Sequence, residues 1–139
     1  MNSNLSAYML IFRESTPEAY EDLSKEQKKE QLGRWNAWCD ELAAQGRMQH
    51  GHPLGSGGRV VSAGSGRRTI DGPFAEAKEM VGGYFIVTAR DLDEASAIAE
   101  DCPLLPFGMT VEVRPVAGGC HLAQSLGWTT MREASSLEA

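Results

Sequence analysis

Two short segments are apolar at every position, and this pattern restricts the fold more than any other feature of the chain. They run from Tyr8 to Phe12 ("YMLIF") and from Tyr84 to Val87 ("YFIV"), and both are rich in residues that favour β-strands. Successive side chains of a strand point to opposite faces of a sheet, so each segment presents apolar groups on both faces. A sheet built from these strands must therefore be covered on both sides.

Two amphipathic helices are predicted between the strands. Ser24 and Gln27 have the spacing of a capping box, and the helix that they open is expected to run toward Gly46. The apolar stripe of this helix is Leu32, Trp35, Trp38, Cys39, Leu42 and Ala43. Asp91 and Glu94 form a second capping signal. The stripe of the second helix is Leu92, Ala95, Ile98 and Ala99.

The order of these elements predicts the fold. Arg59 to Ser62 and Arg68 to Ile70 are expected to be hairpin strands in a glycine-rich region, and Met109 to Val116 is expected to be the last strand. The resulting order is strand, helix, hairpin, strand, helix, strand. It indicates an α+β fold with the β-α-β-β-α-β arrangement of ferredoxin-like proteins. We expect residues 1–116 to form one domain and residues 117–139 a C-terminal tail.

Two helices can cover only one face of such a sheet. The second face is too apolar to be solvated, so we predict that a second copy of the chain covers it in a homodimer. The alternative is that the tail after Gly119 covers that face within one chain.

Charge and cysteine content exclude several classes of protein. The net charge of −6 argues against binding of nucleic acid, which favours a basic surface. Three widely spaced cysteines are typical of free thiols in a reducing compartment. No apolar run is long enough to span a membrane. We therefore expect a cytoplasmic protein that contacts neither membrane nor nucleic acid.

The segment "DGPFAEAKE", from Asp71 to Glu79, contains the most specific motif. Asp-Gly-Pro favours a tight turn, in which Asp71 bonds the backbone and Phe74 anchors the turn in the core. The alternative is that Asp71 takes part in chemistry.

The same segment resembles the signature of the DGPF, or YCII-related, family and differs from it only at Ala77, where the signature has threonine. "GGYFIVTARDLDEA" and "CPLLPFGMTVEVRPV" are similar to further family segments, so the resemblance covers about residues 7–116. It implies a ferredoxin-like fold that dimerises into an α/β barrel. It implies much less about activity, because some relatives are thought to use a histidine–aspartate pair and one branch resembles chloromuconolactone dehalogenases. Family members are also often associated with sigma factors of the extracytoplasmic-function type, as in bacteria.

His50 and His52 are the candidate bases. If they lie on a strand, their side chains point to the same side, and histidine ionises near neutral pH without any perturbation. A neighbouring Asp71 would orient one of them, as carboxylates do in catalytic triads. The alternative is that both histidines are solvated turn residues. No spacing supplies the third ligand that a zinc site needs, so no metal and no other cofactor is predicted.

These residues suggest a binding cleft between the sheet and the helices. We expect it to hold a small aromatic or anionic molecule beside Tyr8, His52, Asp71 and Arg114, with Phe74 as a further ligand contact. Arg114 would receive an anion. The alternative is a salt bridge between Arg114 and Glu112, within one chain or across the dimer, in which Arg13 takes part.

The functional hypothesis has two forms. The first is an enzyme with acid–base chemistry of the lyase, isomerase or dehalogenase type. The second is a non-catalytic binding or regulatory module that meets a protein partner such as a sigma factor. In a third reading the DGPF turn is purely structural.

Overall fold

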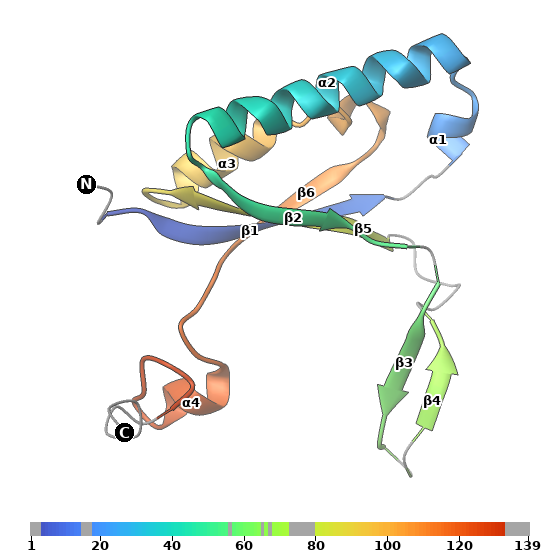
Figure 1. Ribbon diagram of the computed structural model, residues 1–139. Coiled ribbons are helices and arrows are strands. Elements are labelled where there is room, and N and C mark those ends of the chain that lie inside the picture. The colour runs from blue at the N-terminus through green and yellow to red at the C-terminus, as the bar shows by residue number, and fades with distance from the viewer. Residues whose placement is uncertain are drawn as a thin grey trace.

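The structure is a computed structural model that describes residues 4–14, 18–55, 57–64, 66, 68–72 and 80–132. Its centre is a four-stranded antiparallel sheet in the order β2-β5-β1-β6. The strands are β1 (Ser6–Glu14), β2 (Met48–Pro53), β5 (Met80–Ala89) and β6 (Thr110–Pro115). Helix α2 (Lys25–Ala44) joins β1 to β2, and α3 (Leu92–Glu100) joins β5 to β6. Both helices lie on the same face of the sheet (Figure 1), which confirms the ferredoxin-like α+β prediction.

Smaller elements complete the described chain. They are α1 (Glu18–Glu21), the short 3₁₀ helix η1 (Leu105–Phe107), the hairpin strands β3 (Arg59–Ser62) and β4 (Arg68–Asp71), and α4 (His121–Ser125). The predicted hairpin is therefore confirmed. Figure 1 shows that the hairpin and α4 both project on the side of the sheet opposite to α2 and α3. No described helix is both long enough and apolar enough to cross a membrane.

Local signals in the sequence set the ends of α2. The Ser24 hydroxyl accepts from the Gln27 backbone N–H at 3.1 Å, and the Gln27 side chain accepts from the Ser24 N–H at 2.8 Å. This is the predicted capping box. Just past the helix, Gly46 has a φ of +71°, a conformation in which glycine is favoured. Of the predicted stripe, Trp38 and Leu42 are buried, whereas Leu32 and Ala43 are exposed, so the stripe was wrong at those two positions.

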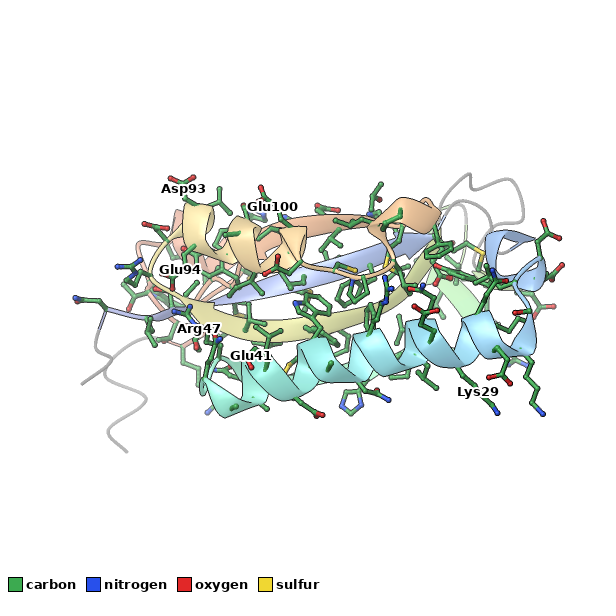
Figure 2. The ribbon with its side chains drawn as sticks, turned by 90° about the horizontal axis from the view of Figure 1, so that it is seen from above. Lys29, Glu41, Arg47, Asp93, Glu94 and Glu100 are labelled. Atoms are coloured by element: carbon green, nitrogen blue, oxygen red, sulfur yellow. The ribbon has the colours of Figure 1, made fainter. Side chains whose placement is uncertain are left out.

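Helix α3 begins at the predicted cap, where Asp91 Oδ1 accepts from the Glu94 N–H at 2.8 Å. Leu92 is exposed, contrary to the prediction, while Ala95, Ile98 and Ala99 are buried. The Glu94 carboxylate accepts from Arg47 at 2.5 Å and from Arg90 at 2.6 Å. These two guanidinium groups lower the pKa of Glu94 to about 2. Figure 2 shows Arg47, which directly precedes β2, beside Glu94 in the first turn of α3. This ion pair joins the segment that follows α2 to α3.

The core lies between the sheet and the two helices. Leu10 and Val87 are fully buried there, from the two central strands. Four aromatic rings pack beside them, mostly edge to face. The ring centroids of Phe12 and Phe85 are 4.8 Å apart, and those of Trp35 and Trp38 are 5.2 Å apart.

The other face of the sheet, here called the open face, is not covered by any of the described helices (Figure 1). By strand alternation it carries Met9, Ile11 and Ile86, together with an ion pair in which Arg13 Nη2 lies 2.8 Å from Glu112 Oε1. The predicted pairing of Glu112 with Arg13 is thus made within one chain. Figure 1 shows the described part of the tail held away from this face.

Candidate functional site

A cavity of about 360 Å³ lies at one end of the sheet, on the side of the helices. Its apolar walls are Phe12, Trp35, Phe85, Leu104 and Met109. These residues come from β1, α2, β5 and the connection between α3 and β6. The walls are mainly aromatic, and cavities of this size and lining are typical of small-molecule sites.

Two glycines form the floor of this cavity, which we call the glycine-floored cavity. A Cβ atom on Gly51 would collide with the Phe85 ring and lie 2.8 Å from the Tyr84 carbonyl oxygen. A Cβ atom on Gly83 would lie 2.9 Å from the His52 carbonyl oxygen. Only glycine therefore fits at these two positions, and β2 and β5 present bare backbone to the cavity there.

A β-bulge places a carboxylate at the edge of the cavity. Phe12 pairs with Gly83 and Arg13 pairs with Val81, so Gly82 is left without a partner on β1. A Cβ atom on Gly82 would lie 3.1 Å from the carboxyl carbon of Glu14. Glu14 therefore lies directly over the bulge and lines the cavity.

Tyr20, on α1, is close to Glu14. Burial raises the pKa of Tyr20 to about 12, and the Glu14 carboxylate contributes through its negative charge and as a hydrogen-bond acceptor. The phenol thus stays protonated over the whole neutral range. Glu14 and Tyr20 also line a second cavity, of about 310 Å³, under the first half of α2.

His50 and His52 lie on the same side of β2, as predicted, and both contact Tyr84. The Tyr84 hydroxyl is 3.4 Å from His50 Nδ1, and the two histidine ring centroids are 6.2 Å apart. Both histidines are exposed. Gly51 lies between them and faces the Phe85 ring in the core, so the two side chains stand on the open face. His52 still borders the glycine-floored cavity, because its position on β2 is beside the cavity floor.

The other predicted site residues are dispersed in the single chain. The Asp71 side chain is 100% exposed on β4, where its carboxylate is 4.0 Å from Arg59 Nε. Tyr8 is buried in the core, and Arg114 is exposed on β6, with its Nε 3.8 Å from Glu112 Oε2. Phe74 lies outside the described residues. Within the part of the chain that the structure describes, no hydrogen bond or ion pair joins Asp71 to either histidine.

Sequence reasoning missed Glu14, Tyr20 and the glycine floor. A signal was present, because Gly51, Gly82 and Gly83 interrupt segments that otherwise have strand character. Glycine inside a strand often marks a bulge or a close approach of another group. The sequence did not indicate that Glu14, which is distant along the chain, would lie over that bulge.

The described ranges contain no group of three or more His, Cys, Asp or Glu side chains arranged to hold a metal ion.

Comparison with known proteins places the fold in a family. The family model of the YCII-related domain matches residues 7–117, which is most of the chain. The chain therefore belongs to the YCII-related domain family, and the resemblance found in its sequence is confirmed. No curated protein sequence matches it.

One similar solved structure is 5-chloro-2-hydroxyhydroquinone dehydrochlorinase (TftG) from Burkholderia phenoliruptrix AC1100, in complex with 2,5-dihydroxybenzoquinone. The two chains are 21% identical, and the match covers 81% of this chain and 95% of the other, with a TM-score of 0.46.

Proposed function

We propose that this protein is a homodimer that binds a small, flat aromatic molecule in the glycine-floored cavity and carries out acid–base chemistry on it. The observation that carries this proposal is the cavity itself, whose aromatic walls stand over a floor from which side chains are missing. The rings of Phe12 and Trp35 have centroids 5.1 Å apart, in an edge-to-face arrangement. Walls of this kind favour a planar ring, which can stack on one neighbour and meet the edge of another.

One group is placed to move a proton in this cavity. Glu14 lines the cavity from the end of β1, and a carboxylate is a suitable general base when it lies within hydrogen-bond reach of a substrate proton. His52 borders the cavity with its backbone, while its imidazole stands on the open face. Acid–base chemistry of the lyase, isomerase or dehalogenase type needs no redox cofactor. The roles expected for Asp71, His50 and His52, and for Tyr8, Phe74 and Arg114, stay predictions.

The open face supports the proposed homodimer. Met9 and Ile11 are half-buried on this face, beside Ile86, which is already buried in one chain, and a second copy of the chain would present the same apolar strip in return. Two-fold packing of the sheets would also enclose His50 and His52, which a single chain leaves exposed. The Asp71 hairpin projects on this same side (Figure 1), so a partner chain would lie beside it.

The dimer is tested by light scattering during size-exclusion chromatography. We expect a mass near twice the 15.1 kDa of one chain. Ile11→Glu places a charge in the strip and should give monomers, whereas Leu92→Glu, on the exposed start of α3, should leave the mass unchanged. A wild-type protein that stays monomeric at high concentration would contradict the dimer.

Ligand binding is tested by a thermal-shift screen of phenols and other aromatic compounds. A compound present at 100 times its Kd should stabilise the protein by about 2.7 kcal/mol. Gly83→Ala pushes β2 and β5 apart beneath the cavity, because its Cβ would lie 2.9 Å from the His52 carbonyl oxygen, and should weaken the binding of any hit by at least about tenfold, a difference of about 1.4 kcal/mol. Gly33→Ala is the matched control, because its Cβ meets nothing within 4 Å. Hits that bind equally well to both variants would place the ligand elsewhere.

A second function is favoured by the C-terminal segment. Leu122 is 74% exposed, and Leu126 and Met131 are also exposed, although residues 119–132 fold back on themselves. Such a surface suits a protein partner, so a non-catalytic regulatory module linked to a sigma factor is the alternative proposal. Substitution of Leu122 and Leu126 by serine should abolish binding of such a partner. If the same variant still binds small molecules as the wild type does, the partner surface and the ligand cavity are separate sites.

A further inference from the structure

The row of β1 side chains that faces the helices ends in a carboxylate. Tyr8, Leu10 and Phe12 alternate along this strand, and all three are buried. Glu14 is the next member of the row, is half-buried, and lines the glycine-floored cavity beside Phe12. Its carboxyl group lies against the backbone of Gly82, where a Cβ atom would be 3.2 Å from Glu14 Oε2. The strand therefore directs a negative charge toward an otherwise apolar interior.

Within the described part of the chain, no cation compensates this charge. Glu14 takes part in none of the ion pairs there, and the residues that line the glycine-floored cavity include neither lysine nor arginine. Lys28 lines the second cavity together with Glu14, but the two side chains form no ion pair. The imidazole of His52 stands on the open face. A charge that faces a protein interior is normally paired, so Glu14 is an exception that calls for a partner.

Tyr20 supplies a hydrogen bond to Glu14 but no charge. Burial, with a further contribution from the Glu14 carboxylate, raises the pKa of Tyr20 to about 12, so the phenol is neutral at physiological pH. Its hydrogen bond leaves the negative charge of Glu14 in place. What the site still lacks is therefore a positive charge.

The walls of the cavity suit a cation as well as a flat ring. Phe12, Trp35 and Phe85 all line it. The faces of aromatic rings carry negative partial charge and attract ammonium groups, most strongly in the case of tryptophan. A carboxylate beside aromatic walls is a combination that attracts an ammonium group on a short apolar arm and repels an anion.

We propose that the ligand of the glycine-floored cavity is a cationic arylalkyl amine, whose ring lies against the aromatic walls and whose ammonium group pairs with Glu14. The inference rests on the proposed function, because it specifies the ligand of the same cavity. An anionic ligand, the other class expected from the sequence, would meet the Glu14 carboxylate in this cavity without a cation to hold it.

Three probes of similar size separate the effect of charge from that of shape: benzylamine, benzyl alcohol and benzoate. Binding at neutral pH is followed by tryptophan fluorescence, because Trp35 lines the cavity. Benzylamine should bind at least about tenfold more tightly than benzyl alcohol, because a charge-assisted hydrogen bond is about twice as strong as a neutral one. Benzoate should bind at least about tenfold more weakly than benzyl alcohol, because it places a like charge beside Glu14.

Two variants assign the preference to Glu14. Glu14→Gln keeps the size of the side chain and removes its charge, so benzylamine should lose its advantage over benzyl alcohol. Glu100→Gln is the matched control at the exposed end of α3 (Figure 2), since it changes the net charge by the same amount and should leave the preference unchanged. The order of the three probes on the wild type tests the proposal even where Glu14→Gln fails to fold.

The outcomes separate the two proposals. Equal binding of benzylamine and benzyl alcohol, tight binding of benzoate, or an amine preference that survives Glu14→Gln would overturn the cationic ligand and leave the proposed function standing. The same holds if none of the three probes binds while the thermal-shift screen finds another aromatic ligand. If that screen also finds no ligand, both proposals are overturned.

Discussion

The two ends of the sheet differ although the same helix, α2, passes over both. At one end Trp38 and Leu42 are buried against the strands, and the ion pairs of Glu94 fix α3 to the start of β2. At the other end Gly51 and Gly83 present bare backbone to the cavity, and Leu32 remains exposed. Both ends use apolar walls, but only the first end packs large side chains from the helix tightly against the strands. The packed end supplies stability, and the end with the cavity is the proposed ligand site.

The largest expected effect contrasts two residues of the α2 stripe. Trp38→Ala should lower the free energy of unfolding by about 3–5 kcal/mol, because it removes a large ring from the filled end. Leu32→Ala should change it by less than about 0.5 kcal/mol, because its side chain is mostly in solvent. Urea denaturation of both variants gives the comparison. Equal losses would mean that the two ends are packed alike.

A smaller loss of stability is expected when a side chain is added at Gly83, at the other end of the sheet. Gly83→Ala places a methyl group 2.9 Å from the His52 carbonyl oxygen and should cost about 1–3 kcal/mol of unfolding free energy. Gly33→Ala, on the open surface of α2, should instead stabilise by about 0.5–1 kcal/mol. If Gly83→Ala were as stable as the wild type, the floor would be looser than its contacts indicate.

The ion pairs at the filled end should appear in the pH dependence of stability. The pKa of Glu94 falls from 4.5 to about 2 on folding, so its contribution is present above pH 4.5 and is lost as the pH falls toward 2. Glu94→Gln should therefore be less stable than the wild type at pH 6, and the two should converge near pH 2. Thermal unfolding from pH 2 to pH 6 measures this, and curves that stay parallel would contradict it.

The smallest effect concerns Tyr20 at the hollow end. Its pKa rises from 10.0 to about 12 on folding, so the folded state holds the phenolic proton more tightly than the unfolded state does. Stability from this group is full below pH 10 and is lost as the pH rises toward 12. Tyr20→Phe should flatten that alkaline decline, as unfolding at pH 9 and pH 11 can test. An unchanged slope would mean that Tyr20 is not buried beside Glu14.

The predicted helix caps and strand alternation, which depend on neighbours along the chain, were confirmed, whereas the predicted helix stripes were wrong at Leu32, Ala43 and Leu92. Ser24 with Gln27 and Asp91 with Glu94 make the expected caps, since each pair is three residues apart and needs only one helical turn to meet. His50 and His52 lie on one side of β2 because strand alternation requires it. The predicted cleft beside Tyr8, His52, Asp71 and Arg114 depended on distant neighbours. In one chain the structure places Tyr8 in the core and Arg114 on the open face.

Residue order and spacing were sufficient for the ferredoxin-like fold, because hydrophobic periodicity and caps act within a few residues of chain. The sequence alone also predicted that both faces of the sheet are apolar. Only the tertiary structure decided where the hollow lies. It depends on a bulge at Gly82, on Glu14 lying over that bulge and on two glycines from different strands meeting beneath α2. Contacts between distant segments are set by the packing of the whole sheet, and no local pattern encodes them.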